Sequence, residues 1–487
     1  MTDGLLLGID LGTTQVKTGL YDAQGNEYGF SRAQLSPPVR DAEGRSEQDP
    51  ENWWVACCRA IRQCVGSADA SRVRAMCVGG QGPTLVAVDA EGAPVRSAIL
   101  YDDRRAAKEA VEISERLGRA VSLRSSYLPR VVWIWKQDPV SFRSTRWFLQ
   151  AWDFLVYRLT GTAATTAPSV DAYIPWQDED LAMLGLEPSL FPGRVETGER
   201  VASLSTEAAA ELGLPEGALV VAGGNDFLFG TMGVAGAQKG VAQSQGGATG
   251  ALTLCWDRPL RGEMIGWSIR SPIDPALFNT GGPLTTGGAA LDWLLQSVLY
   301  WDDPEEALEE AAQVASGSEG LLFFPYLAGE RLLDRAADRG VFLGLSLQHG
   351  AAHLIRAVLE GVALAGRDIL ESLVDGGGRV DRVVTYGGQA RSSLWNQIKA
   401  DVWNRPVEIP RVVDAGCLGA AAIAATGLGI YPTLSEASQQ MARVGCTFVP
   451  DADRLGLYEE AYSIYQEIGL RNRDLFVRLA ALRGRRG

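Results

Sequence analysis

The chain has 487 residues, of which 46% are hydrophobic and 21% charged, and its formal net charge is −14. These are ordinary values for a globular protein with room for about two to four domains. The negative charge argues against non-specific nucleic-acid binding, and no stretch approaches the roughly 18–20 apolar residues that span a bilayer.

The N-terminus, MTDGLLLGID, is too short and too acidic for a signal peptide. The seven cysteines show no CxxC spacing and are typical of buried free thiols in a reducing compartment. We therefore expect a cytoplasmic protein. His349 and His353 lie four apart on a predicted helix face without a carboxylate or cysteine at ligand spacing, which argues against a zinc site.

The first predicted elements are strands at 5–10 and 16–22, joined by the turn Asp-Leu-Gly-Thr-Thr. Residues 72–95 repeat the strand–turn–strand pattern. Helices are predicted over 104–118 and 147–160, the second ending at Gly161.

The same pattern recurs in the second half, where residues 240–255 are again predicted to form a strand, a glycine-rich turn and a strand. An internal repeat of this kind predicts two related α/β domains, each offering one tight turn to a shared cleft. We place the domains at 1–240 and 241–487.

Both turns suit phosphate, because small residues expose backbone N–H groups and allow close approach. The first turn adds the hydroxyls of Thr13 and Thr14 and the carboxylate of Asp10, which could hold Mg²⁺. The second, at 246–250, adds Thr249. Either turn alone more often just reverses a strand, whereas two at equivalent positions are stronger evidence.

A third glycine site lies within 383–407, where a predicted strand meets Gly387 and Gly388 before a helix with an apolar stripe. Such a helix start suits an adenine or ribose, although a plain strand-to-helix turn explains it equally simply. Other nucleotide motifs fail: no GxGxxG follows a strand, and the P-loop-like residues 12–18 lack the second glycine.

One carboxylate, Asp226, lies in the otherwise apolar and glycine-rich run 220–233. A strand is predicted before it and a helix after it, so the carboxylate lies near a helix N-terminus, where N–H groups favour an anion. Taken alone, this arrangement makes Asp226 or Asn225 a helix cap.

Residues 340–361 resemble the C-terminal signature of the FGGY carbohydrate kinases, with Gly340, Phe342 and Gly344 followed by His353 and Glu360. Further blocks that resemble the family occur in its order, so the resemblance covers nearly the whole chain and falls on the xylulokinase side. These blocks are at 10–22, 47–54, 325–331, 387–402 and 414–429.

The resemblance implies two actin-like, RNase H-type ATPase domains with ATP and sugar in the cleft between them. It implies transfer of the γ-phosphoryl group of ATP to a hydroxyl of a ketose or polyol, with xylulose or a related pentulose as first candidate. By analogy with the family, the partners are a small-molecule sugar and a second copy in a homodimer. The implied roles are catalytic base for Asp226, Mg²⁺ binding for Asp10, and nucleotide binding for Gly12, Thr13, Thr14, Gly247, Thr249, Gly288, Asp292, Gly388 and Ser392.

Two segments, 79–89 and 98–105, are expected to face the sugar. Besides Asp226, the implied substrate-binding residues are Gln81, Gly82, Pro83, Tyr101, Asp103 and Arg105. The Met-His pair usual after this glutamine in xylulokinases is absent, which argues against xylulose itself, and the Arg-Glu pair of glycerol kinases is absent too. Ala248 stands where the family has threonine, and residues 329–340 are one residue shorter than the family pattern.

Two alternatives share these motifs. An actin-like or heat-shock-chaperone-like ATPase would have similar phosphate loops, and a non-catalytic sugar-sensing protein would keep the sugar site alone. The family signature argues against the first, and the presence of both Asp10 and Asp226 argues against the second.

Overall fold

The computed structural model describes residues 4–66, 68–123, 126–167, 176–330, 332 and 336–483. The chain forms two compact units. The first comprises Met1–Ala235, Pro272–Pro275 and Ala415–Arg443, and the second Gly236–Ser271, Ala276–Asp414 and Val444–Gly487.

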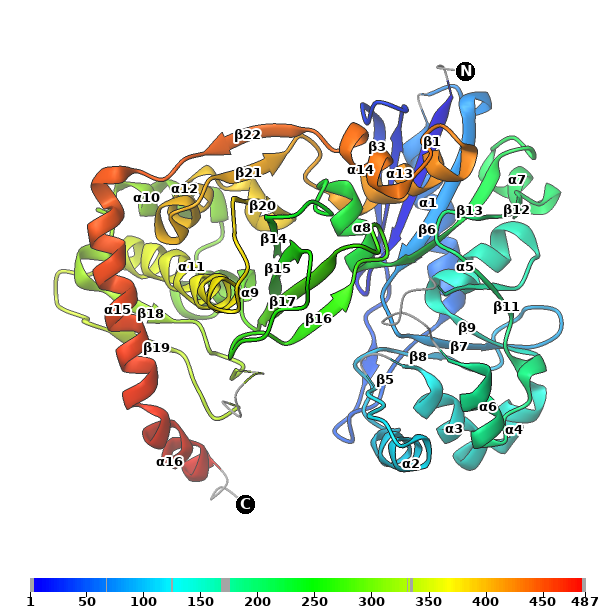
Figure 1. The fold of residues 1–487 in the computed structure, drawn as a ribbon, viewed down its shortest axis with the longest axis horizontal. Helices are drawn as coiled ribbons and strands as arrows, with labels where there is room; N and C mark the ends of the chain where they lie inside the picture. Colours follow the sequence, from blue (N-terminus) through cyan, green and yellow to red (C-terminus); the bar gives the residue numbers. More distant parts are fainter. Residues whose placement is uncertain are drawn as a thin grey trace. The chain divides into compact units, whose positions relative to one another are not determined.

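The first unit is built on a six-stranded sheet in the order β12-β13-β6-β1-β2-β3 (Figure 1). Strands β1, β6 and β13 run parallel, while β2, β3 and β12 pair antiparallel with their neighbours. The central strand β1 buries all its apolar side chains, as its sequence LLLGIDL predicts for a strand covered on both faces. The strands are β1 (Leu5–Leu11), β2 (Gln15–Tyr21), β3 (Glu27–Gln34), β6 (Val73–Gly80), β12 (Arg200–Ser203) and β13 (Leu219–Asn225).

A second, five-stranded sheet in the same unit has the order β4-β5-β8-β7-β9. Its strands are β4 (Val39–Arg40), β5 (Ser46–Gln48), β7 (Leu85–Val88), β8 (Ala98–Ile99) and β9 (Trp147–Gln150), and β10 (Ala164–Thr166) pairs separately with β11 (Gly193–Val195). The helices are α1 (Pro50–Val65), α2 (Ala107–Leu117), α3 (Leu128–Gln137), α4 (Pro139–Ser144), α5 (Ala151–Thr160), α6 (Asp178–Leu184), α7 (Thr206–Leu212), α8 (Asp226–Gly233), α13 (Ala415–Leu428) and α14 (Leu434–Met441).

The second unit repeats the strand order of the first, with β16 as an additional edge strand. Its seven-stranded sheet runs β16-β17-β15-β14-β20-β21-β22, with β14, β20 and β21 parallel, as β1, β6 and β13 are. The two related α/β domains expected from the internal repeat are therefore confirmed. The strands are β14 (Val241–Gly246), β15 (Gly250–Trp256), β16 (Trp267–Arg270), β17 (Phe278–Leu284), β20 (Arg382–Tyr386), β21 (Val407–Pro410) and β22 (Val444–Phe448), with β18 (Leu322–Phe324) and β19 (Val341–Leu343) in a separate hairpin.

The long helix α11 (Ala351–Asp375) packs beside α12 (Ser393–Trp403) in the core of this unit. Within α11 the signature residue Glu360 is fully buried and accepts hydrogen bonds from Arg356 Nε (2.9 Å), Gly317 N (2.9 Å), Ser318 Oγ (2.8 Å) and Tyr458 OH (2.8 Å). The remaining helices are α9 (Gly288–Trp293), the π-helix Leu294–Leu299, α10 (Pro304–Gln313), α15 (Leu455–Arg471) and α16 (Arg473–Arg483), with η5 (Gly388–Arg391) before α12.

Several expectations from the sequence need correction. Residues 147–150 form strand β9, and the helix begins only at Ala151, although it ends at Gly161 as predicted. The two strands within 73–88 belong to different sheets. His349 precedes α11, and Cys446 is exposed while the other six free cysteines are buried.

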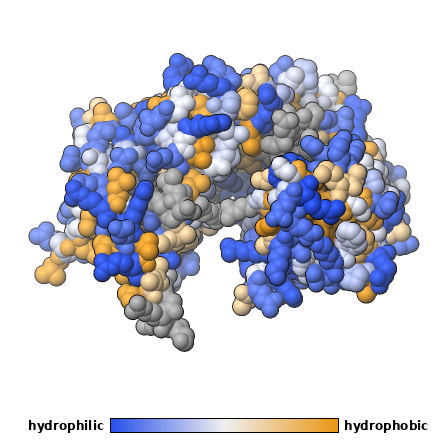
Figure 2. Space-filling view, turned by 60° about the horizontal axis from the view of Figure 1, so that its bottom comes forward, coloured by the Kyte–Doolittle hydropathy of each residue, from blue (hydrophilic) through white to orange (hydrophobic). Residues whose placement is uncertain are grey.

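The chain crosses between units at Ala235 and Gly236, close to the expected boundary at 240, and Ala415–Arg443 then returns to the first unit. Helix α13 makes this return possible because glycines let it touch other backbones: a Cβ on Gly8 would lie 1.9 Å from Cys417 O, and one on Gly419 would lie 2.0 Å from Phe229 O. No helix in the described parts of the chain is long and apolar enough to cross a membrane. The face shown in Figure 2 carries hydrophilic residues with small separate apolar patches.

We predict that Glu360→Gln lowers the free energy of unfolding by about 3 kcal/mol, because it leaves the buried Arg356 guanidinium without its counter-charge. Urea unfolding measures the loss. The control Glu467→Gln removes a solvent-exposed helical ion pair with Arg471 and should cost less than about 0.5 kcal/mol. Equal losses in the two variants would contradict a stabilising role for Glu360.

Candidate functional site

Residues 12–14 join β1 to β2, and their carbonyl groups are held by other parts of the first unit. Gln48 Nε2 donates to Thr13 O (2.8 Å) and Leu35 N donates to Thr14 O (2.8 Å). Gln81 Nε2 lies 3.5 Å from Gly12 O, and Gln81 Oε1 accepts from Thr13 Oγ1 at 3.1 Å. Two glutamine side chains thus fix the shape of the first loop.

Fixing the carbonyls also fixes the amide N–H groups. In a trans peptide the C=O and the following N–H point in opposite directions. The N–H groups of Thr13 and Thr14 accordingly face away from the glutamines, and neither donates a hydrogen bond to any described residue. Consecutive, uncommitted donors of this kind are able to bind an anion.

The second loop, residues 247–249 between β14 and β15, is built by the same means. Gly247 O accepts from Gly288 N (2.9 Å) and from Gln389 Nε2 (3.1 Å). Ala248 O accepts from Gly287 N (2.9 Å) and Ala289 N (3.0 Å). The N–H groups of Ala248 and Thr249 donate to nothing within the described ranges, and both residues are exposed.

Of the residues expected at the nucleotide, Gly288 contacts the second loop and Gly388 lies beside Gly246 at its start. Gly288 is in direct contact, since a Cβ there would lie 2.9 Å from Gly247 O. Gly388 is exposed, and a Cβ there would lie 3.7 Å from Gly246 O. Ser392 caps α12 by accepting from Trp395 N (3.2 Å), and Asp292 is an exposed residue of α9 whose pKa partial desolvation raises.

The carboxylates of Asp10 and Asp226 belong to the first unit. Asp10 is the half-buried penultimate residue of β1, and a Cβ on Gly416 would lie 2.7 Å from its Oδ2, so the start of α13 comes close to this carboxylate. Asp226 is the first residue of α8. The cap is Asn225, whose side chain accepts from Leu228 N (2.9 Å), so capping does not depend on Asp226.

The Asp226 carboxylate accepts one hydrogen bond from Phe227 N (2.9 Å). The side chain is accessible to solvent, but many protein atoms surround the carboxylate and reduce its hydration. This desolvation, together with the negative charge of Asp10, raises the pKa of Asp226 from 3.8 to about 6. A carboxylate with this pKa is ionised at neutral pH and readily takes up a proton.

The two segments expected at the sugar differ in how many of their polar groups already form hydrogen bonds within the protein. Asp103 is buried and accepts from Ser46 N (2.6 Å) and Arg105 NH2 (2.7 Å), and Arg105 also donates to Glu47 (2.7 Å) over the ring of Trp133. Tyr101 is exposed. The pair Asp103–Arg105 is therefore satisfied internally.

In the other segment, Gln81 is buried against the first loop, and Gly82 packs on an aromatic ring. A Cβ on Gly82 would lie 2.6 Å from Trp152 Cζ3. Pro83 is half-buried beside it.

Sequence reasoning missed several residues. Among the buried polar atoms that have no hydrogen-bond partner in the described residues are Trp152 Nε1, Thr84 Oγ1 and Tyr127 OH. Trp152 contacts Gly82 and Thr84 follows Pro83, so unpaired donors adjoin a predicted sugar segment. Gln48 and Gln389 were missed as loop supports because their tertiary partners are distant in the chain.

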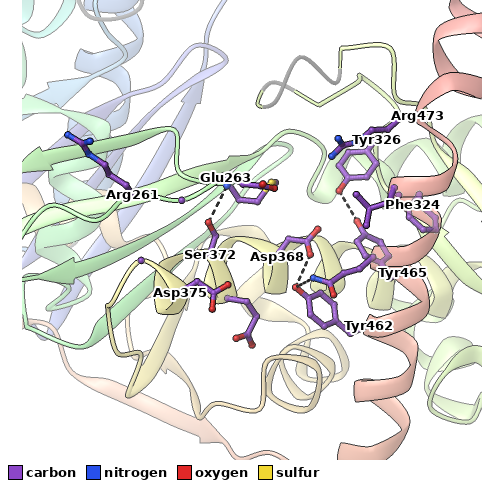
Figure 3. A pocket seen from close by; sticks show the side chains of 17 residues that line it. Arg261, Glu263, Phe324, Tyr326, Asp368, Ser372, Asp375, Tyr462, Tyr465 and Arg473 are labelled. Carbon is purple, nitrogen blue, oxygen red and sulfur yellow. Dashed lines mark hydrogen bonds between the residues drawn. The ribbon is translucent and has the colours of Figure 1, made fainter.

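The predicted site residues lie outside a further cavity of about 520 Å³ in the second unit (Figure 3). Figure 3 shows two hydrogen bonds on its wall, from Tyr462 OH to Asp368 and from Tyr465 OH to Tyr326.

Arg331 and Leu333–Arg335, part of the shortened segment 329–340, lie outside the described residues.

A repeated α/β sheet with a turn of uncommitted N–H groups in each copy is typical of phosphate-handling proteins, and comparisons with known proteins identify the family. The models for the N-terminal and C-terminal domains of the FGGY family of carbohydrate kinases match residues 5–233 and 260–428. This chain belongs to the FGGY family of carbohydrate kinases.

Among its relatives, a xylulose kinase of Staphylococcus epidermidis is 30% identical, with 98% of each chain covered. An autoinducer-2 kinase of Yersinia enterocolitica is 28% identical over 95% of this chain and 94% of its own. The crystal structure of a xyloylose kinase from Brucella ovis superposes with a TM-score of 0.82 at 27% identity, covering 97% of this chain and 100% of that one.

The protein is therefore a carbohydrate kinase, a phosphotransferase with an alcohol group as acceptor, as the sequence predicted. Its substrate is a small-molecule sugar, and kinases of this family use ATP, generally with a divalent metal. The family assignment replaces the alternatives of a chaperone-like ATPase and a non-catalytic sensor.

We predict that Gly82→Ala lowers the free energy of unfolding by about 1–3 kcal/mol, because the added Cβ overlaps the ring of Trp152. Thermal unfolding monitors the effect. Gly217→Ala is the matched control, since no atom lies within 4 Å of its added Cβ. Unchanged stability of Gly82→Ala relative to this control would show that the contact with Trp152 is loose.

Proposed function

We propose that this chain transfers the γ-phosphoryl group of ATP to a hydroxyl of a ketose or polyol, with xylulose or a related pentulose as the first candidate. The observation that carries the proposal is the pair of loops, 12–14 and 247–249, at equivalent positions in the repeated sheets. In both, other residues bind the carbonyls and leave consecutive N–H groups uncommitted. Oriented N–H groups of this kind stabilise phosphate without reorganising during the reaction.

Each loop contributes further groups to the nucleotide. Gly12 and Gly247 allow close approach, and Thr13, Thr14 and Thr249 add hydroxyl groups. On the adenosine side we assign Gly288, Asp292, Gly388 and Ser392, supported by the contact of Gly288 with the second loop and by the position of Gly388 beside Gly246.

Asp10 fits a Mg²⁺ site because its carboxylate is half-buried near the end of a strand. Mg²⁺ binds oxygen ligands of this kind, usually through water. A bound Mg²⁺ would neutralise the charge of the phosphates. The contribution of the chain is to hold Asp10 Oδ2 in one place, and the absence of a side chain at Gly416 leaves room for it.

Asp226 is the proposed general base. Because Asn225 already caps α8, the Asp226 carboxylate is available to accept the proton of the attacking sugar hydroxyl. Its raised pKa supports this role, since a base works best when its pKa approaches the working pH.

For the sugar we propose contacts with Gln81, Gly82, Pro83, Tyr101, Asp103, Arg105 and Asp226. The exposed ring of Tyr101 suits stacking on sugar C–H groups, and the Asp103–Arg105 pair would act as a rigid wall. A cytoplasmic location and a homodimer remain predictions.

A coupled assay of ADP release tests the substrate across ketoses, aldoses and polyols of different chain length, with autoinducer-2 included because a relative is named for it. We expect strong stimulation by one ketose or polyol. ATP hydrolysis that is indifferent to every sugar would contradict the proposal.

We predict that Asp226→Asn lowers kcat by about 10²–10⁴ while ATP still binds, because only proton transfer is lost. In the wild-type protein, kcat/KM should rise as the pH increases through about 6, where Asp226 ionises. The variant should lack this limb of the pH profile. Near wild-type turnover in Asp226→Asn would remove the base assignment.

The same pKa shift predicts a stability effect. Because the folded-state pKa of Asp226 is raised above 3.8, ionisation costs stability as the pH rises from about 4 through about 6. Asp226→Asn should therefore unfold at a higher temperature than wild type at neutral pH.

A further inference from the structure

The second unit contains a buried lysine that forms no ion pair with any carboxylate of the described residues. Lys399 lies in α12 with 2% of its surface exposed, and its Nζ is 5.3 Å from the ring centroid of Trp395 and 5.8 Å from that of Trp403. Among the described residues, its one hydrogen-bond partner is Gln389 Oε1, at 2.9 Å. Burying an ammonium group with so few partners is costly, and burial lowers the pKa of Lys399 to about 7.

The lysine is connected to the second loop through this one contact. Gln389 is itself buried in η5, and its Nε2 donates to Gly247 O at 3.1 Å. The amide lies under the loop: a Cβ on Gly246 would be 2.7 Å from Gln389 Cβ, and one on Gly287 would be 2.9 Å from Gln389 Nε2. The path Lys399–Gln389–Gly247 therefore runs without a gap from the core to the loop.

The chemistry of the lysine decides which way the amide faces. A glutamine side chain has one accepting and one donating end, and an ammonium group can only donate. Lys399 in its ammonium form therefore requires Gln389 to turn Oε1 toward it, which turns Nε2 toward the Gly247 carbonyl. Without the lysine, the amide loses the contact that distinguishes its two ends.

We propose that Lys399 is a positioning residue for the second phosphate loop. It orients the Gln389 amide, the amide holds the Gly247 carbonyl, and the planar peptide then directs the Ala248 N–H toward the phosphate. This inference rests on the proposed function, in which loop 247–249 binds phosphate. It explains why α12 keeps a lysine between two tryptophans, where methionine would fill similar space without a desolvation cost.

The test uses Lys399→Met, Gln389→Met and the double variant in the full-length protein, with Kd for ATP, KM for the sugar and thermal unfolding as readouts. We expect each single variant to weaken ATP binding about tenfold, the equivalent of ~1.4 kcal/mol, while the sugar KM changes less than about twofold. Because both residues act through one hydrogen bond to Gly247, the double variant should be no weaker than Gln389→Met alone.

Lys239→Met is the matched control, since Lys239 also lies over a tryptophan ring in this unit but is exposed and paired with Asp257. It should leave ATP affinity unchanged. Additive losses in the double variant, or ATP affinity that stays at the wild-type value in Lys399→Met, would overturn the inference. A wild-type protein that binds no ATP would instead overturn the proposed function, so the two failures are distinguishable.

Discussion

The two short loops 12–14 and 247–249 present consecutive N–H groups together only because the orientation of their peptide planes is fixed. A loop of small residues would ordinarily sample many conformations, and a phosphate would then have to order it on binding. In this protein the carbonyl groups of both loops are already bound. Glutamine side chains take part in each case: Gln48 and Gln81 at the first loop, and Gln389 at the second. The conformational entropy of each loop is lost when the protein folds, so the N–H groups already have their orientation before any ligand binds.

The two loops reach this state through different supports. The first is held by Gln48 at the end of β5 and by Gln81 just after β6, and these side chains also contact each other, since Gln81 Nε2 lies 3.3 Å from Gln48 Oε1. The second is bound by the N-terminus of α9 and by a single amide that a buried lysine orients. The repeated sheet therefore preserves the position of the loop, while the residues that stabilise it differ between the copies.

Residues that carry the family resemblance divide into structural and chemical roles. Glu360 is part of the C-terminal signature, yet in this fold it is a buried acceptor for Arg356, Ser318, Tyr458 and a backbone N–H. Asp226, in contrast, is exposed, is spared the capping role by Asn225, and has a pKa raised by desolvation and by Asp10. A motif residue thus serves the fold in one case and is available for chemistry in the other.

The sequence alone determined the features that depend on neighbours along the chain. The hairpins around 10–14 and 246–250, the strand and helix on either side of Asp226, and the helix that begins behind Gly387 and Gly388 all follow from local patterns of apolar residues, glycines and caps. The order of several motifs also identified the family. Only the tertiary structure decided that β9 replaces the start of a predicted helix and that α13 returns to the first unit. It also decided which distant side chains support the loops, namely Gln48, Gln81, Gln389 and Lys399. These contacts join residues far apart in the chain, and a glutamine or lysine in a sequence carries no signal of the distant carbonyl or amide that it will bind once the sheets have formed.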